Sequence, residues 1–533
     1  MNTHARLRLL LSLLAAGLVV LPGCGTWIPA KGRVEAIRAD AAPVSGVTAS
    51  TTTDATAESG ATDLPATVRL DPESTLRLAF HHSRALQARR DSLAAAALDL
   101  LEQRRAFGPQ LSGELAGRLE FAGDNDGFAP SGTAVFSDVL PTAAKFRVDG
   151  STAQTPDREE GDWDSRVKAR IDQPLLAGAG YEASHEALIQ AQRDLVQRLR
   201  QFEIDRQDLA IEVLDAFYKL VGLRSQLDNA RTALERSEFA LRRSEAMFKV
   251  QLAPYIDVAR SQQQAISSQR RLEDAQLRYD SAEKRILLQL GLPPETGLEL
   301  TAVTPQLIPL AATIDECETA ALDRRLDLRN ALDSVEDAAR RLRTARGNRW
   351  PDLALFAEAG RSGQGTGAFQ ADDPEDSAAA GLALQIDPDR RDQRDALERA
   401  RILLAAAERD ATLARDEARV EVFEETERLT TVRRQVALGE ENLAVARRRY
   451  ENAMLRFEAG ELGNRDVVEA ENGLLDARNT LVDTAISHEI ARLRLLARIG
   501  LLDVGPEGAL LDASGPSTPP RLFGPPEPLR IPK

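Results

Sequence analysis

The sequence predicts a mainly α-helical protein that also carries membrane-spanning β-strands. Of its 533 residues, 28% are charged and only 4% are aromatic, and long stretches consist of Ala, Leu, Glu, Arg and Gln. That composition is typical of long helices and coiled coils. Two further observations support this fold class: the chain repeats itself at a fixed offset, and short segments of alternating apolar and charged residues interrupt the helical ones.

The first residues have the features of an export signal. Arg6 and Arg8 precede an apolar run over residues 9–21, which is shorter than the roughly 20 residues that a membrane-spanning helix needs. The segment Leu-Pro-Gly-Cys that ends at Cys24 resembles a bacterial lipobox. We therefore predict a signal peptide over 1–23 and lipidation of Cys24, with Gly25 favouring the outer membrane. The alternative is an ordinary signal peptide with an incidental cysteine.

Composition also predicts the limits of the folded part. Residues 24–67 are rich in Ala, Thr, Ser, Gly and Pro, which is typical of a flexible tether. Residues 504–533 form a Pro-rich tail. Between them we predict a first repeat over 68–301 and a second over 302–503.

The two repeats are related by an offset of 209 residues. The segments FKVQLAPYID, from Phe248, and FEAGELGNRD, from Phe457, align Asp257 with Asp466 (466 − 257 = 209). On both sides of these turns, apolar or small residues recur at alternating spacings of three and four in each copy. Such spacing is a coiled-coil seam, so each repeat is predicted to contain an antiparallel helical hairpin.

The helices implied by these seams have unequal lengths. In each repeat one long helix is matched by two short ones that together reach its length. A long helix of about 70 residues would extend about 105 Å. The predicted helices cover about 72–107, 181–251, 315–347, 390–459 and 465–500. A further return helix is predicted to begin near Asp257 and to end at Gly291.

Four segments between the helices alternate with a period of two and are predicted as strands. In 163–172, Trp163, Val167 and Ile171 share one side, whereas the other side carries only Asp, Arg and Lys. Segments of about ten residues with one apolar and one charged side fit the strands of a membrane barrel. The four strands are 109–121, 163–172, 352–360 and 378–387. The connections 122–162 and 361–377, rich in Gly, Asp, Ser and Pro, are predicted as extracellular loops.

Four strands cannot close a barrel by themselves. Open strand edges are not viable in lipid, because their backbone groups would lack hydrogen-bond partners. The predicted sheet therefore requires further copies of the chain.

The order of these segments resembles the outer-membrane efflux protein family, the TolC-like channels, over about 70–502. The segments that carry the resemblance are STLRLAFHHSRALQARRDSLAAA (74–96), NRWPDLALFAEAG (348–360) and FEAGELGNRDVVEAENGLLDAR (457–478). The resemblance implies a homotrimer with four strands per chain in a shared 12-stranded β-barrel, and helices that form a coiled-coil tunnel through the periplasm.

The resemblance also implies a function. It is that of an outer-membrane exit duct of a tripartite efflux or type I secretion system, passively conducting substrates from an inner-membrane pump. The implied partners are a periplasmic adaptor protein, the pump and outer-membrane lipid in a Gram-negative envelope. The alternative is a periplasmic coiled-coil scaffold lipoprotein without transport activity.

The resemblance places an acidic ring at the tip of the tunnel. In the second turn the family pattern falls on Asp466 and Glu469, three residues apart on one helical face. Asp257 is the matching acid of the first repeat. Three copies would form an anionic ring that favours cations. The alternative is helix capping, since each acid lies near a helix N-terminus.

The composition and motifs favour no other chemistry. The net charge of −15 and the lack of a dense basic block speak against nucleic acid as a partner. None of the five histidines lies in a metal-binding motif, so we expect no catalytic residues, no cofactor and no metal. Cys317 is expected to be a small buried residue.

Overall fold

We describe a computed structural model of the chain. The structure describes residues 67–122, 125–154, 163–251, 254–301, 307–368, 374–459, 461–505, 508 and 510–511. Cys24, the predicted signal peptide and nearly all of the predicted tether and tail lie outside these residues. The described chain divides into two compact units. The strand unit comprises Leu98–Arg193 and Asp337–Leu404, and the hairpin unit comprises the remaining residues.

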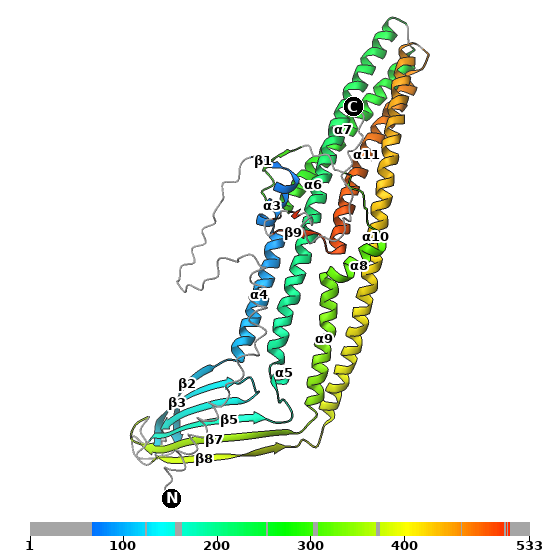
Figure 1. Cartoon of the computed structure of the whole chain (residues 1–533). Helices are drawn as coiled ribbons and strands as arrows, with labels where there is room; N and C mark the ends of the chain where they lie inside the picture. Colours follow the sequence, from blue (N-terminus) through cyan, green and yellow to red (C-terminus); the bar gives the residue numbers. More distant parts are fainter. Residues whose placement is uncertain are drawn as a thin grey trace. The chain divides into compact units, whose positions relative to one another are not determined.

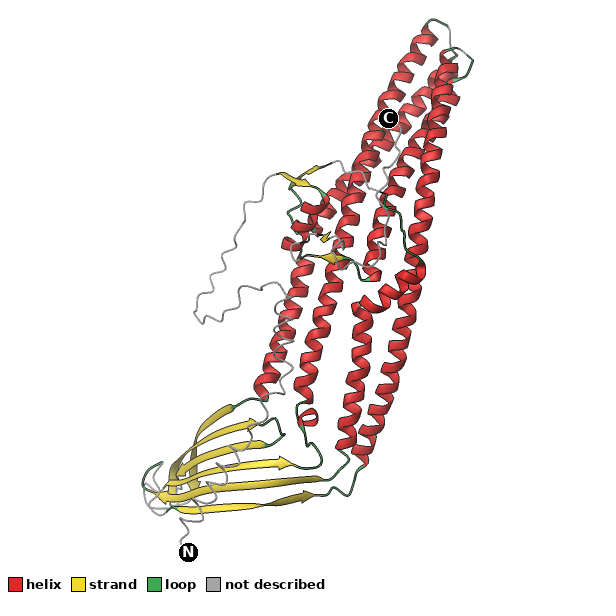
Figure 2. Cartoon of the chain, viewed as in Figure 1, coloured by secondary structure: helices red, strands yellow, loops and turns green. Residues whose placement is uncertain are grey.

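The strand unit contains one antiparallel sheet of six strands (Figures 1 and 2). Their spatial order is β2-β3-β4-β5-β7-β8, so every neighbour in space is also the neighbour in sequence within the sheet. The strands are β2 (Gln110–Ala122), β3 (Asn125–Val139), β4 (Lys145–Gln154), β5 (Trp163–Pro174), β7 (Asp352–Gly365) and β8 (Glu375–Gln385).

Four of these strands were predicted and two were not. The predictions over 109–121, 163–172, 352–360 and 378–387 are confirmed as β2, β5, β7 and β8. The prediction of a loop over 122–162 is wrong, because β3 and β4 lie there. The count of four strands per chain is therefore also wrong, because the sheet has six strands. The shared trimeric barrel stays a prediction. The apolar side chains of Val135 and Val139 fall on the otherwise polar side of β3, which hides its alternation.

The register of the sheet gives it two chemically different faces. Residues paired across the strands lie on the same face, and the odd-numbered residues of β5 share a face with the leucines of β2, β7 and β8. We call this the apolar face: Leu111, Leu115, Ala134, Phe136, Phe146, Val148, Val167, Ile171, Leu353, Leu355, Leu382 and Leu384. Leu115 is 92% exposed and Leu382 is 65% exposed.

The opposite face, which we call the charged face, carries Glu114, Arg147, Asp149, Arg166, Lys168, Arg170, Asp172 and Glu358. Several of its charges pair across or along strands. Lys168 Nζ lies 2.8 Å from Glu358 Oε2, and the Arg170 guanidinium donates to both Glu358 and Asp172. The apolar face also carries Asp138 and the ion pair of Arg361 with Asp376. Large exposed leucines mainly on one face and most charges on the other are the pattern of a sheet between lipid and water.

The helices have nearly the predicted bounds. They are α3 (Pro72–His82), α4 (Arg84–Ala106), α5 (Tyr181–Ser184), α6 (Glu186–Lys249), α7 (Tyr255–Gln289), α8 (Ile314–Arg324), α9 (Leu326–Gly347), α10 (Arg391–Glu458) and α11 (Asn464–Ile499). None of the helices within the described ranges is long and apolar enough to cross a membrane.

The hairpin unit contains two helical hairpins, α6 with α7 and α10 with α11 (Figure 1). The predicted seams are confirmed by burial at most positions, with an exception at Phe248, which is 44% exposed. Cys317 is fully buried in a cluster that includes Val422 and Leu495, as expected for a small core residue. Buried seam residues are Leu227, Ala230, Ser237, Ser244, Ser268, Tyr279, Ile286, Val436, Leu443, Ala453, Leu474, Ala477, Leu481 and Leu495.

The short helices before each first strand are interrupted, which the sequence did not predict. The chain is extended at Ser83 (φ −60°, ψ 120°) and at Arg325 (φ −59°, ψ 125°), and these residues separate α3 from α4 and α8 from α9. Both α3 and α8 begin with a capping box, in which an N-cap side chain and the side chain three residues later each bond the other's backbone N–H.

Short strands complete the hairpin unit. β1 (Thr67–Leu70) pairs in parallel with β6 (Gly297–Leu300), and β9 (Asp503–Val504) pairs with β10 (Leu510–Leu511). Leu70 is fully buried against α3 and α6 residues, including Leu76 and Phe217. The first described residues are thus part of the core.

The element bounds reveal that the repeat has two offsets. Helices α3 and α8 start 242 residues apart (314 − 72), as do α4 and α9 (326 − 84) and the strands β2 and β7 (352 − 110). Helices α7 and α11 start 209 apart (464 − 255). Most of the difference of 33 residues (242 − 209) arises between β2 and β5, where β3 and β4 lie, since β5 and β8 start 212 residues apart (375 − 163).

In each repeat, one glycine allows two segments of the chain to lie unusually close together. Gly291 and Gly500 have a φ of 75° and follow α7 and α11. A Cβ on Gly291 would lie 2.2 Å from the backbone oxygen of His82, and one on Gly500 would lie 3.1–3.3 Å from Arg324 atoms. Each glycine therefore allows the end of a return helix to meet the end of α3 or α8.

Candidate functional site

The turn ends of the two hairpins lie next to each other within the hairpin unit (Figure 1). Two cation–π contacts join α6 to α10 there. The Arg236 guanidinium carbon lies 5.7 Å from the ring centroid of Tyr450, and that of Arg243 lies 5.0 Å from Phe457. Both arginines and both aromatic residues are seven apart. A heptad repeat keeps such residues on one face of a helix, so the contacts stack along the same line.

A cavity of about 230 Å³ lies beside these contacts. Its lining includes Arg236, Arg243, Tyr450, Phe457 and Glu471. Glu471, on α11, lies 3.7 Å from Arg236. Burial raises the pKa of the Glu471 carboxyl, and the nearby Arg236 opposes that rise. The cavity thus contains an acid whose charged form is destabilised by loss of water.

The two acids predicted from the second turn lie at the start of α11. Asp466 and Glu469 are both exposed. Glu469 Oε1 lies 2.7 Å from Arg449 Nη2 of α10, so part of its charge is neutralised within the hairpin. Asp466 is in the first turn of α11, whose N-cap, Gly463, makes no side-chain cap hydrogen bond.

Asp257 lies in the other hairpin, in the first turn of α7. It is half-buried, and its carboxylate lies 3.5 Å from Arg260 of the same helix. The structure therefore places Asp466 and Glu469 together on α11 and Asp257 on α7. The acidic ring of three copies stays a prediction.

Several residues of this site were not found from the sequence. Arg236, Arg243 and Arg449 lie beside the seams, where a single chain shows many similar arginines. The available signal was the matching seven-residue spacing of two arginines in one repeat and two aromatic residues in the other.

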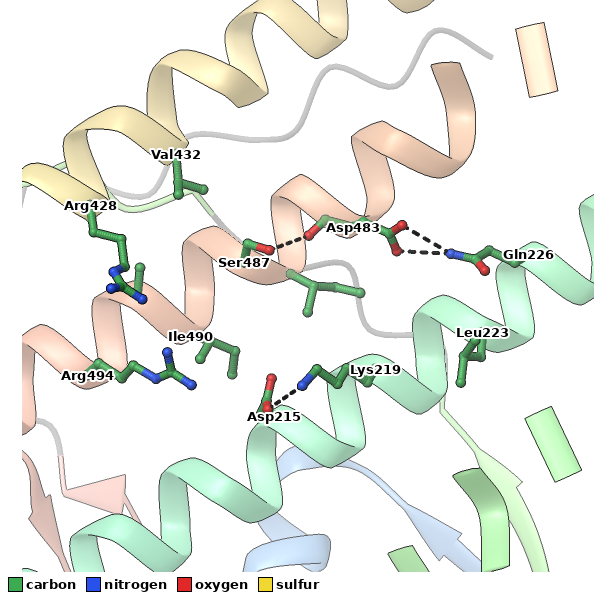
Figure 3. A pocket seen from close by; sticks show the side chains of 12 residues that line it. Asp215, Lys219, Leu223, Gln226, Arg428, Val432, Asp483, Ser487, Ile490 and Arg494 are labelled. Carbon is green, nitrogen blue, oxygen red and sulfur yellow. Dashed lines mark hydrogen bonds and ion pairs between the residues drawn. The ribbon is translucent and has the colours of Figure 1, made fainter. Parts of the chain in front are cut away.

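A second, larger cavity of about 700 Å³ lies among α6, α10 and α11 (Figure 3). Its charged groups are partly paired: Lys219 Nζ lies 2.7 Å from Asp215 Oδ2, and the Gln226 amide donates to Asp483 at 3.0 Å. Burial raises the pKa of the Asp483 carboxyl, whereas the hydrogen bond from Gln226 lowers it. The lining mixes both charges with apolar side chains and presents no set of groups arranged for covalent chemistry.

Candidate metal ligands do not cluster in the described residues. In the described part of the chain, no group of three or more His, Cys, Asp or Glu side chains is arranged to hold a metal ion.

Residues 319–501 match the family model described as outer membrane efflux protein. Comparison with curated protein sequences finds no match. Solved structures are similar in fold. The structure of CusC shares 15% identity at a TM-score of 0.62, covering 80% of this chain and 92% of CusC.

The solved structures of two further outer-membrane proteins are also similar to this chain. VceC of Vibrio cholerae shares 15% identity at a TM-score of 0.61, covering 80% of this chain and 96% of VceC. The outer membrane channel MtrE of Neisseria gonorrhoeae, solved in its open state, shares 13% identity at a TM-score of 0.59, covering 81% of this chain and 89% of MtrE. These similarities show that the chain shares their fold.

Proposed function

We propose that this chain, which matches the outer membrane efflux protein family over residues 319–501, is an outer-membrane channel that serves as the exit duct of a tripartite efflux or secretion system. The sheet would cross the outer membrane and the helices would form a tunnel in the periplasm. Substrates would pass without a chemical step, driven by an inner-membrane pump.

One observation carries this proposal: the sheet has an exposed apolar face, a charged face and two edges, β2 and β8, that pair with no other described strand. In lipid those edges need partners. Pairing with further copies of the chain satisfies them and encloses the charged face around water. A periplasmic scaffold has no need of a sheet whose leucines are exposed on one side.

Single-channel recording tests the proposal directly. Purified protein inserted into planar bilayers should give discrete conductance steps. The tip contacts are proposed to hold the channel closed, so the double variant Arg236→Gln, Arg243→Gln should open more often. Arg242→Gln is the matched control, because Arg242 is exposed and pairs only weakly, at 3.9 Å, with Glu238 of its own helix. Absence of conductance from the parent and the double variant would exclude a channel.

The acidic residues of the second turn are proposed to bind cations at the tip. Asp466→Asn should weaken block by divalent cations, because it removes a charge from each copy of the ring. Glu469→Gln should have a smaller effect, since Arg449 already neutralises part of that charge. Asp257→Asn tests the acid of the first repeat. Equal block in all variants would argue for simple helix capping.

The partners are proposed from the family: a trimer of this chain, a periplasmic adaptor, an inner-membrane pump and, through Cys24, outer-membrane lipid. Cross-linking in intact cells followed by purification of the chain should recover an adaptor and a pump. Recovery of the chain alone, under conditions that preserve its own oligomer, would contradict a tripartite system.

A further inference from the structure

We infer that the β3–β4 hairpin is part of the membrane wall, so that three copies would close an 18-stranded barrel, wide enough at its outer mouth for bulky hydrophilic cargo. This inference rests on the proposed function. It concerns the surplus residues between β2 and β5 of the first repeat, for which the second repeat has no counterpart.

The side chains of the hairpin continue both faces of the sheet. On the apolar face, Phe146 pairs with Ile171 and Val148 with Ala169 of β5. On the charged face, Arg147 lies opposite Arg170 of β5 in the strand register. The Arg147 guanidinium lies 2.6 Å from the Asp149 carboxylate of its own strand. A loop outside the membrane would not need this alternation.

The same continuity holds on β3. Phe136 pairs with Leu111 on the apolar face, and Thr133 pairs with Glu114 on the opposite face. The rings of Phe136 and Phe146 lie 6.1 Å apart in an edge-to-face arrangement. The two added strands thus pack against each other on the side that the leucines occupy.

The hairpin also spans the whole height of the sheet. β3 pairs with β2 from Ser137 opposite Gln110 to Asn125 opposite Ala122. β4 pairs with β5 from Lys145 opposite Asp172 to Gln154 opposite Trp163. The turn between β3 and β4 is anchored at the end of β5, where the Gln173 amide donates to Thr142 O at 2.9 Å. The hairpin is therefore inserted between β2 and β5 rather than folded beyond them.

The strand number permits regular closure. Six alternating strands leave β2 and β8 running in opposite directions at the two edges. β8 of one copy can therefore pair with β2 of the next in an antiparallel manner, as in bacterial outer-membrane barrels. Three copies of six strands make eighteen.

The number of strands determines the size of the cargo that can pass through the barrel. The diameter of a barrel grows roughly linearly with strand number, so the mouth would be about 1.5 times as wide as that of a 12-stranded barrel. Barrels of 16–18 strands leave an aqueous channel. Because the charged face carries Arg, Lys, Asp and Glu in mixture, the mouth would favour large hydrophilic cargo without strong selection by charge.

Cysteine accessibility in the membrane tests the inference. Phe136→Cys and Val148→Cys should be protected by lipid from a water-soluble thiol reagent. Thr133→Cys and Arg147→Cys should be labelled. Ile171→Cys and Arg170→Cys on β5 serve as matched controls for the two faces, and the parent chain gives the background of its native cysteines.

The controls separate two kinds of failure. Alternation on β5 combined with equal labelling of both faces of β3 and β4 would overturn the 18-stranded barrel and leave the channel intact. Loss of alternation on β5 as well would overturn the proposed function itself. Protection and labelling that alternate on all three strands support the inference.

A second measurement reports the width. Polyethylene glycols of increasing size, added on the barrel side, reveal the largest polymer that still enters and lowers the conductance. Removal of residues 125–154 should leave β2 to pair with β5 and reduce the mouth to about two-thirds of its width, with a smaller cut-off. An unchanged cut-off in a variant that inserts and conducts would contradict the inference.

Discussion

At the scale of single residues, Gly291 allows the end of α7 to contact the backbone of His82, which a residue with a side chain would hinder. Its φ of 75° disfavours a side chain, and the backbone of His82 occupies the space that a Cβ would need. We predict that Gly291→Ala destabilises the protein by about 1–3 kcal/mol through strain and overpacking. Thermal unfolding followed by helical circular dichroism measures the change.

Gly473→Ala is the matched control. Gly473 lies inside α11, and a Cβ there would meet nothing within 4 Å. The substitution should stabilise by about 0.5–1 kcal/mol, because alanine loses less backbone entropy in a helix. Equal effects of the two substitutions would show that the close approach at His82 does not matter.

Glu471 gives the tip a dependence on pH. Its pKa in the folded protein is raised above the ordinary value of 4.5 by burial, against the opposing charge of Arg236. A group with a raised pKa contributes stability below its ordinary value, and that contribution is lost as pH rises through the folded value. The melting temperature should therefore fall as pH rises above about 4.5.

Glu471→Gln should reduce this decline, and melting curves at pH 4 to 8 measure it. Glu469→Gln, at an exposed position on the same helix, serves as the control. The interpretation fails if the parent and Glu471→Gln show the same slope.

At the scale of elements, a buried ion-pair cluster attaches α9 to α6 within the strand unit. Arg340 is 5% exposed, and its three guanidinium nitrogens donate to Glu186, Asp337 and Gln190, each at 2.8 Å. Arg340→Ala should cost about 3–5 kcal/mol, because it leaves the Glu186 carboxylate without its cation and Asp337 with Arg193 alone. Urea unfolding measures the loss. Arg341→Ala, at the exposed neighbouring position, should change stability little.

The sequence predicted elements where one periodicity dominates. The spacing of three and four fixed the long helices to within a few residues, and the strict alternation around Val167 located β5. The sequence did not predict the interruptions of the helices at Ser83 and Arg325, since the segments around both residues contain good helix formers. The capping boxes at α3 and α8 offered a signal for helix starts but none for these breaks. β3 was missed because it contains many small residues, and because Val135 and Val139 lie on its otherwise polar side and weaken the alternation of apolar and polar residues.

The candidate site was predictable only in part for a related reason. Acids at the helix starts follow from local sequence, so Asp257, Asp466 and Glu469 could be named. Contacts such as that of Arg243 with Phe457 depend on how two hairpins pack, which no local pattern specifies. The pairing of Glu469 with Arg449 depends on the same packing.

At the scale of the whole molecule, we predict that the lipid at Cys24 is an accessory anchor. Cys24→Ser should abolish palmitate labelling while much of the protein still reaches the outer membrane, because the sheet itself would be held by lipid. Radiolabelling together with membrane fractionation measures both results. Loss of the chain from the outer membrane, with export still intact, would show that the anchor is required for assembly.

The two offsets of the repeat bear on how such proteins diverge. Adding one strand to an alternating sheet would reverse every later strand and turn its side chains to the wrong face. Adding a hairpin preserves the direction and facing of all the strands that follow, so the helices downstream can keep their packing although their sequence positions shift. Natural variation in this architecture should therefore change strand number in steps of two, and the width of the proposed pore can evolve without any change in the helices.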